Sequence, residues 1–326
     1  MIISKTPYRI SFFGGGTDYP QWYNKFGGSV ISTSINYYSY ISVKNLENFY
    51  KHKYRILYAK TEQTNNIPQI KHPSVKEVLK YFKIKNNLEI HHQGDLPSRS
   101  GIGSSSSFTN GLINCIYNIK NIKTNKLKIA LKSIEIEQNK IRETVGSQDQ
   151  IATAIGGLNR INFSKNDIKI KKIPISAKNR KIFESHILLV FTEIVRDSFK
   201  YSKNIVKNFK FNLKEMEELI MYVDEAYKLL IHKNFSPFEF GKLLSDYWKI
   251  KKNLSKNTSN ETIDNIYNIS IKNGALGGKL LGAGGGGFFL IIADPSEHFK
   301  IKKKLSPLVC LNCKFENEGT SIIFRS

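Results

Sequence analysis

The first candidate for chemistry is a loop rich in glycine and serine at residues 97–107. Gly101 and Gly103 would let the backbone come close to a ligand. Apolar residues recur at helical spacing after the loop, so it opens a helix whose first N–H groups and dipole favour an anion. The serine hydroxyls add donors, and beside a bound nucleotide one could hold Mg²⁺. The loop lacks the Gly-Lys-[Ser/Thr] of a Walker A sequence, and alone it would also describe an ordinary helix cap.

A carboxylate falls on the apolar side of a second predicted helix. Residues 126–145 repeat apolar side chains at helical spacing, and Glu137 lies on the same stripe. The other members of the stripe are Leu127, Ala130, Leu131, Ile134, Ile141 and Val145. A buried carboxylate needs a partner. Either an ion pair with Arg or Lys or a metal ion would satisfy Glu137.

A second carboxylate begins the next helix. Gly146 ends the preceding helix, Ser147 can cap a new one, and Gln150 stands at the capping-box position. Asp149 lies in the first turn, where the helix dipole favours a negative charge. By local rules alone, Asp149 would be no more than a good helix starter.

Two further glycine-rich loops adjoin strands. Residues 2–13 alternate into a strand that ends at Gly14-Gly15-Gly16-Thr17-Asp18, a tight loop with one carboxylate at its lip. The run 282–287 fits G-x-G-x-x-G, but it leads into an apolar β-run, which excludes a Rossmann site. It indicates a close backbone approach, either between domains or to a phosphate. Neither His-Arg-Asp nor Asp-Phe-Gly occurs, so the chain is not a protein kinase.

The rest of the pattern mixes strands with helices and favours two domains. Strands are predicted over residues 29–33, 37–43, 88–95, 158–163, 187–191, 288–292 and 321–324. Two or three helices are expected between 202 and 273, and residues 45–70 form a loop or a hairpin insertion. A chain of 326 residues exceeds one typical domain.

Composition narrows the range of functions. The sequence has no apolar run of 18 residues and no signal-peptide core, so we expect a cytoplasmic protein without membrane contact. A net charge of +23 would suit a polyanion, but the lysines are scattered among Asn and Ile, and an anionic small substrate fits equally well. We therefore expect no nucleic-acid partner. Cys310 and Cys313 form a lone Cys-x-x-Cys, which is more often structural than metal-binding.

Three separated stretches together resemble one family, the GHMP small-molecule kinases. They are Pro7-x-Arg9-x-x-x-x-Gly14-x-x-Thr17-Asp18-Tyr19, Pro97-x-x-x-Gly101-Ile-Gly103-Ser-Ser105 and the 282–287 loop. The resemblance implies a two-domain α+β fold, with an S5-like domain at 1–180 and a ferredoxin-like domain at 181–326. It also implies transfer of the ATP γ-phosphoryl to a substrate hydroxyl, with ATP and Mg²⁺ as cofactors.

The resemblance also implies a role for each matching residue. Asp149 would be the catalytic base, with Arg9 stabilising the ionised species beside it, and Thr17 and Asp18 would bind substrate. Mg²⁺ would be held by Ser105 and Glu137. The ATP-binding residues would be Pro97, Ser100, Gly101, Ile102, Gly103, Ser104, Ser105 and Ser106.

The acceptor is inferred from differences within the family. Gly15 and Gly16 stand where galactokinases have Glu-His, and the loops around Thr192 and Lys279 look like the branch of heptose 7-phosphate kinases and fucokinase domains. That branch implies phosphorylation of D-glycero-D-manno-heptose 7-phosphate at O1, giving the 1,7-bisphosphate on the route to GDP-heptose and surface polysaccharide. Glu193 departs from this pattern, because glycine is expected there.

A 7-phosphate would need a cationic clamp. Arg196 is the candidate, helped by Ser198 and Lys279. An exposed arginine beside Asp197 is the alternative. The other readings are an L-fucose or other monosaccharide 1-kinase and, in another class, a non-catalytic relative that binds nucleic acid. The oligomeric state is open, a homodimer included.

Overall fold

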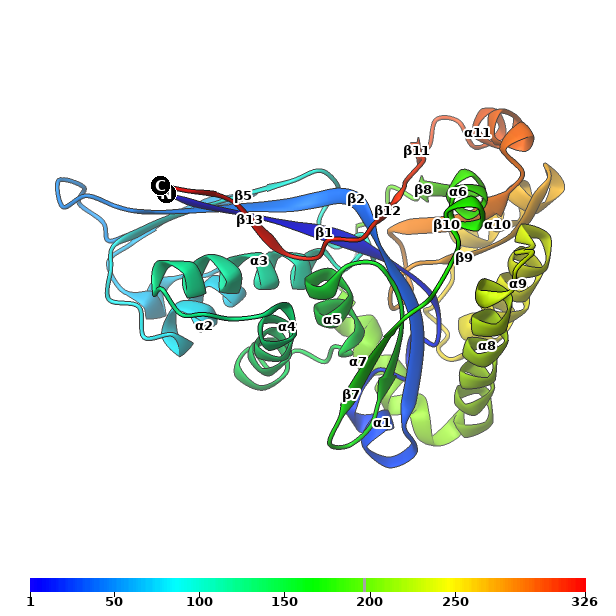
Figure 1. Ribbon diagram of the computed structural model, residues 1–326, viewed down its shortest axis with the longest axis horizontal. Helices are drawn as coiled ribbons and strands as arrows, with labels where there is room; N and C mark the ends of the chain where they lie inside the picture. The colour runs from blue at the N-terminus through cyan, green and yellow to red at the C-terminus, as the bar shows by residue number, and fades with distance from the viewer. Residues whose placement is uncertain (196–197) are drawn as a thin grey trace.

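The computed structural model describes residues 1–195 and 198–326, and for residues 198–200 it describes the backbone alone. The described chain forms two β-sheets, with helices packed on each (Figure 1). The larger sheet contains β1 (Ile2–Phe13), β2 (Gly28–Asn45), β3 (Tyr54–Leu57), β4 (Thr61–Thr64), β5 (Leu88–Gly94), β6 (Leu158–Phe163), β7 (Ile168–Lys172), β12 (Phe315–Glu316) and β13 (Ser321–Arg325). The smaller sheet contains β8 (Ile187–Phe191), β9 (Ala275–Leu280), β10 (Phe288–Ala293) and β11 (Cys310–Leu311).

The larger sheet is built around β1 and β2. Its strand order is β13-β1-β2-β5-β3-β4, and β6 and β12 also pair with the long strand β2. The two β-runs predicted at 29–33 and 37–43 are parts of this one strand, and the predicted insertion is the β3–β4 hairpin. Below the sheet in Figure 1 lie α2 (Pro73–Tyr81), α3 (Ser104–Ile119), α4 (Lys126–Ile134) and α5 (Gln148–Ile155). The short helix α1 (Pro20–Phe26) follows the first glycine loop.

The smaller sheet has the order β11-β8-β10-β9 and carries the helices of the chain's second half. Four helices lie in the region where two or three were expected: α7 (Ser198–Asn208), α8 (Leu213–Ile231), α9 (Pro237–Asn253) and α10 (Glu261–Lys272). Helix α9 packs on β9 and also on α8, which itself reaches β1 and β2. The flanking helices are α6 (Ala177–Ser185) and α11 (His298–Leu305).

One apolar core joins the two sheets. Phe12 of β1 packs its ring 5.2 Å from that of Phe183 in α6 and 5.6 Å from that of Phe240 in α9. All three side chains are buried. Aromatic pairs at these separations stabilise a core beyond the area that they bury, so the two halves are held in a fixed relation.

The end of the chain returns to the first sheet. Strand β12 pairs with β2, and β13 pairs with β1, which places the two termini side by side (Figure 1). A division at residue 180 therefore separates the two halves along the chain, but residues 315–325 complete the N-terminal sheet. The run at 321–324 predicted a strand but not its partner.

The helix predicted over 126–145 differs from the structure in length and in phase. Helix α4 ends at Ile134 and continues as a π-helical segment, η2 (Glu135–Lys140). Leu127 and Leu131, expected inside, are 39% and 44% exposed. The buried side chains are Ile129, Ala130, Ser133, Ile136 and Glu137. The buried positions are therefore shifted by about one residue from the predicted stripe. Glu137 is still buried, as the sequence predicted.

The 282–287 loop makes the close backbone approach that its glycines suggested. Gly287 has a φ of 99°, and a methyl group there would collide with the carbonyl of Ser100 in the serine-rich loop. The next residue, Phe288, donates its N–H to the same carbonyl at 2.8 Å. The C-terminal half therefore rests directly on the 97–107 loop.

Glu193 occupies a left-handed backbone conformation, which explains why glycine is the expected residue. Its φ is 59°, and its side chain is exposed. For a residue with a Cβ, this conformation costs about 1–2 kcal/mol.

We predict that Glu193→Gly raises the free energy of unfolding by about 1 kcal/mol, since part of the relieved strain is offset by the greater freedom of glycine in the unfolded chain. Urea denaturation would measure the change. Glu193→Ala removes the same carboxylate but keeps a Cβ, so it should leave stability nearly unchanged. Equal gains in both variants would attribute the effect to charge and refute the strain.

Candidate active site

A buried arginine connects three elements at the centre of the site. Arg9 of β1 donates from Nε and Nη2 to the two carboxylate oxygens of Asp149, at 2.8 and 2.7 Å. Its Nη1 donates to the carbonyl of Gly101 at 2.6 Å. Arg9 is 3% exposed, whereas Asp149 is 29% exposed. This planar two-point pairing fixes the carboxylate in one orientation while leaving it accessible.

The serine-rich loop reaches the same point. Gly101 and Gly103 have φ values of 81° and 74°, and Gly103 is the residue before the first turn of α3. Ser100 is buried and donates to the carbonyl of Pro97 at 2.6 Å, while Ile102 accepts the backbone N–H of Arg9 at 3.0 Å. The first N–H groups of α3 have no carbonyl partner within the helix, so they can bind an anion.

Glu137 lies beneath this loop and contacts Ser106. Its Oε2 accepts hydrogen bonds from the Ser106 hydroxyl at 3.0 Å and from the Gln150 amide at 2.5 Å. Ser105, the expected companion of Glu137, has an exposed side chain in the first turn of α3, and Ser104 accepts the N–H of Arg99. Ser106 was expected only as an ATP-binding residue, because the sequence does not show which of four consecutive serines faces inward.

The capping box predicted for α5 is wrong. Gln150 turns its amide to Glu137, and Ser147 makes no side-chain bond to the helix N-terminus. The Ser147 hydroxyl instead meets Tyr23 at 3.2 Å and Gln138 at 3.1 Å. Long-range polar partners have outcompeted the local capping pattern.

The environment of Glu137 suits a magnesium ion that arrives with a nucleotide. Burial raises the pKa of this carboxyl to about 7. Its Oε1 is buried and has no hydrogen-bond partner among the residues that the structure describes. Mg²⁺ in nucleotide sites takes one or two carboxylates, and phosphate and water oxygens complete the shell. Glu137 and a neighbouring serine hydroxyl fit that requirement.

The first glycine loop places a second carboxylate beside Asp149. Asp18 is 5% exposed and accepts the backbone N–H groups of Gly16 at 2.9 Å and of Gln148 at 3.3 Å. Burial raises the pKa of Asp18, and the charge of Asp149 raises it further. A methyl group at Gly146 would collide with this carboxylate. Glycine at 146 therefore permits the contact as well as ending a helix.

Thr17 supports this loop instead of facing a ligand. Its hydroxyl donates towards the carbonyls of Gly14 and Ser29, at 2.9 and 3.1 Å, and accepts the N–H of Ser29 at 3.1 Å. The residue is fully buried. Direct contact with substrate, as the sequence suggested for Thr17, is inconsistent with these bonds.

Two further polar residues complete the site: Ser11, which the sequence did not single out, and Lys279, which was expected to help bind a substrate phosphate. Ser11 donates to Gln148 at 2.8 Å, and Lys279 donates to the Ser11 carbonyl at 2.7 Å. Burial lowers the pKa of Lys279 well below its ordinary value, and the nearby charges of Lys251 and Arg9 lower it further. Ser11 follows Arg9 by two residues on β1, so alternation along the strand was the available signal. Arg196 lies outside the described residues, as does the side chain of Ser198.

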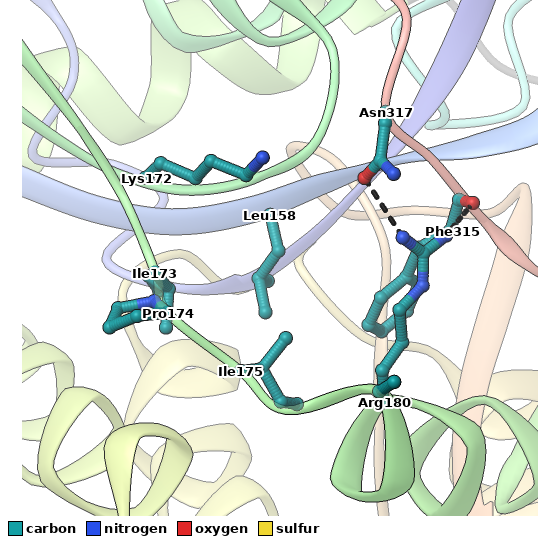
Figure 2. Close-up of a pocket in the computed structure, with 9 residues that line it drawn as sticks. Leu158, Lys172, Ile173, Pro174, Ile175, Arg180, Phe315 and Asn317 are labelled. Carbon is teal, nitrogen blue, oxygen red and sulfur yellow. Dashed lines mark hydrogen bonds between the residues drawn. The ribbon is translucent and has the colours of Figure 1, made fainter.

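A cavity of about 280 Å³ lies away from these residues (Figure 2). Its lining includes Leu158, Ile173, Ile175, Phe315 and Arg180. The Arg180 guanidinium donates to Asn317 at 2.9 Å and to the carbonyl of Phe315. None of the candidate catalytic groups lines this cavity, and its arginine is already bonded.

Two family models match the chain on either side of its middle. Residues 73–157 match the N-terminal domain of GHMP kinases, and residues 231–307 match the C-terminal domain. The first match contains the serine-rich loop, Glu137 and Asp149, which the structure brings together around Arg9. The chain belongs to the GHMP kinase family.

Three relatives of this GHMP kinase are named for sugars or sugar phosphates. It is 28% identical to D-glycero-alpha-D-manno-heptose 7-phosphate kinase of Campylobacter jejuni over 93% of both chains. It is 24% identical to the L-fucokinase/L-fucose-1-P guanylyltransferase of Bacteroides fragilis over 94% of its own length, which is 36% of that protein. A D-glycero-D-manno-heptose 1-phosphate kinase structure from Bacteroides thetaiotaomicron superposes over 100% of both chains with a TM-score of 0.81 at 18% identity.

These comparisons confirm several expectations. The protein is a sugar kinase of the GHMP family with the expected two-domain α+β fold, and ATP is the phosphoryl donor in this family. The reading as a non-catalytic relative is thereby set aside. Within the described residues, no helix is both long and apolar enough to cross a membrane.

We predict that Glu137→Gln stabilises the ligand-free protein at pH 8 and has little effect at pH 4. Between pH 4.5 and about 7 the unfolded chain releases this proton while the folded one retains it, so the stability contributed by Glu137 falls as pH rises. The shift corresponds to about 3 kcal/mol at pH 8. Thermal unfolding at both pH values would measure the difference.

Glu135→Gln is the matched control. Glu135 lies in the same segment but is 34% exposed and paired with Lys132. The added stability that MgATP gives over ATP alone should disappear in Glu137→Gln and persist in Glu135→Gln. Equal pH dependence in the two variants would contradict a buried, metal-facing Glu137.

Proposed function

We propose that this GHMP kinase transfers the γ-phosphoryl of ATP to the anomeric hydroxyl of D-glycero-D-manno-heptose 7-phosphate. The product would be the 1,7-bisphosphate, a precursor of GDP-heptose for surface polysaccharide. The single observation that carries the catalytic part is the Arg9 guanidinium, which contacts both the serine-rich loop and the carboxylate of Asp149. The acceptor is supported by the similarity to the Campylobacter jejuni enzyme and by glycines at 15 and 16.

The proposed mechanism assigns proton transfer to Asp149. Its partly exposed carboxylate accepts the proton of the attacking hydroxyl, and the Arg9 fork holds it in place. An anomeric hydroxyl suits a carboxylate base, because it is more acidic than an ordinary alcohol. Asp18 accepts hydrogen bonds from other sugar hydroxyls.

The donor side of the reaction relies on positioning. The N–H groups that begin α3 would bind the triphosphate, and the residue after the 282–287 loop, Phe288, supports the serine-rich loop by donating its N–H to Ser100. Glu137 and an adjacent serine, Ser105 or Ser106, would hold Mg²⁺. When bound, Mg²⁺ compensates charge on the phosphate oxygens. Arg9 fixes the distance between the loop and the base, which is what phosphoryl transfer requires.

A monosaccharide 1-kinase such as an L-fucose kinase is the second candidate, because the fucokinase relative aligns over nearly the whole chain. The same residues around Asp149 would serve either reaction. The two candidate functions differ in whether the acceptor sugar already carries a phosphate. The two heptose kinases among the relatives are named for different phosphate positions, 7 for one and 1 for the other.

We predict turnover of D-glycero-D-manno-heptose 7-phosphate in an ADP-release assay with ATP and Mg²⁺, and little with heptose 1-phosphate, mannose 6-phosphate, L-fucose or galactose. Asp149→Asn should lower kcat by about 10²–10⁴-fold, the usual contribution of a general base. Asp246→Asn, at an exposed ion pair with Lys249, should retain full activity. Preferred turnover of an unphosphorylated sugar would replace the first candidate with the second.

A further inference from the structure

The residue before Asp149 is a buried glutamine with three polar contacts. Gln148 is 3% exposed, although it begins α5 beside a partly exposed carboxylate. Its Nε2 donates to Oδ1 of Asp149 at 3.3 Å, and its Oε1 accepts the hydroxyl hydrogen of Ser11 at 2.8 Å. Its backbone N–H donates to the Asp18 carboxylate at 3.3 Å. Gln148 therefore connects the proposed base with β1 and with the first glycine loop.

The neighbours of the Gln148 amide fix the direction in which it points. An ionised carboxylate only accepts hydrogen bonds, so the amide must turn Nε2 towards Asp149. Oε1 then faces Ser11, whose hydroxyl donates to it. The reversed amide would place its oxygen against the carboxylate. Because Ser11 follows Arg9 by two residues on β1, the strand that supplies the guanidinium also orients this amide.

The two carboxylate oxygens of Asp149 are not equivalent. Oδ1 accepts from Nε of Arg9 at 2.8 Å and from Gln148, whereas Oδ2 accepts from Nη2 of Arg9 at 2.7 Å. Each carboxylate oxygen has two lone pairs, so both lone pairs of Oδ1 are used. No second donor reaches Oδ2 from the described residues, and the Asp149 side chain is 29% exposed. Oδ2 is therefore the oxygen with a lone pair for a proton.

We propose that Gln148 is a positioning residue, which holds Oδ1 of Asp149 and so makes Oδ2 the oxygen that accepts the proton of the attacking hydroxyl. In this step the hydroxyl O–H bond breaks, and its oxygen forms a bond with the γ-phosphorus of ATP. The bond from that phosphorus to the β,γ-bridging oxygen breaks, and ADP leaves. The inference rests on the proposed kinase activity and adds which oxygen acts and which residue selects it.

The charged groups around Asp149 come from β1, the first glycine loop, β9 and, through Gln150, the π-helical segment. They are Arg9, Asp18, Lys279 and Glu137. A substitution at residue 148 leaves all four in place. Differences among variants of Gln148 therefore report on its amide.

Gln148→Met tests the proposal, because methionine has a similar length and lacks the donor. A hydrogen bond to a carboxylate favours the ionised form, so its loss should move the acid limb of the kcat–pH profile upwards by about one pH unit. Gln148→Glu keeps an acceptor for Ser11 and places a second carboxylate beside the base, so it should move the limb by about two units. KM for ATP should stay within about threefold in both variants, because neither removes a contact of the ATP loop.

Gln138→Met is the matched control. Gln138 is partly buried, and its amide supports the turn before α5 by donating to the Val145 carbonyl and to Ser147, each at 3.1 Å. A disturbed turn would lower kcat in this variant, but its acid limb should coincide with that of the wild type. An equal shift in Gln138→Met would overturn the proposal, and so would an unshifted limb in both variants of Gln148.

A measurement on the ligand-free protein does not depend on the acceptor. The carboxyl carbon signal of Asp149, identified by its absence in Asp149→Asn, can be followed by NMR during a pH titration. Its midpoint should move upwards by about one pH unit in Gln148→Met, as the kinetic limb does, and stay unchanged in Gln138→Met. An unchanged midpoint in Gln148→Met would refute the proposal. A shifted midpoint without turnover of any sugar would support the role of Gln148 and refute only the proposed acceptors.

Discussion

The site depends on one guanidinium held in a fixed orientation. Arg9 is buried on β1, which lies between β13 and β2 in the larger sheet, and its three hydrogen bonds end on α5 and on the loop before α3. A buried arginine must satisfy its donors. The loop and the helix are therefore constrained to meet the strand at one place. Arg9 therefore positions both the loop proposed to bind ATP and the carboxylate proposed to accept the proton.

The features that sequence reasoning found are those with strong local requirements. Gly101, Gly103 and Gly287 have positive φ values, a conformation that few other residues adopt without strain, so their positions are visible as glycine. Glu193, where the family resemblance led us to expect glycine, also has a positive φ. Strands β1, β5, β6, β8 and β10 were predicted because apolar patterning is also local.

The features that it missed are decided by partners far along the chain. Whether Ser105 or Ser106 faces Glu137 depends on how α3 is rotated against a π-helical segment about thirty residues later. A π-helix has more residues per turn than an α-helix, so the 3.6-residue period does not predict which side chains face inward there. The local sequence predicts that Ser147 and Gln150 cap α5, but in the structure they form hydrogen bonds with Tyr23 and Glu137 instead. Ser11 carries no motif of its own, and its contact with Gln148 is what places it in the site.

The return of β13 to β1 also bears on how the protein forms during synthesis. The larger sheet begins with residue 2 and receives its last strand at residues 321–325, so it waits with an open edge while some 300 residues are made. An unpaired edge is a site for wrong pairing with other chains. This edge of β1 can close only after residues 321–325 have been made, and closing it brings residues that are more than 300 positions apart into one sheet.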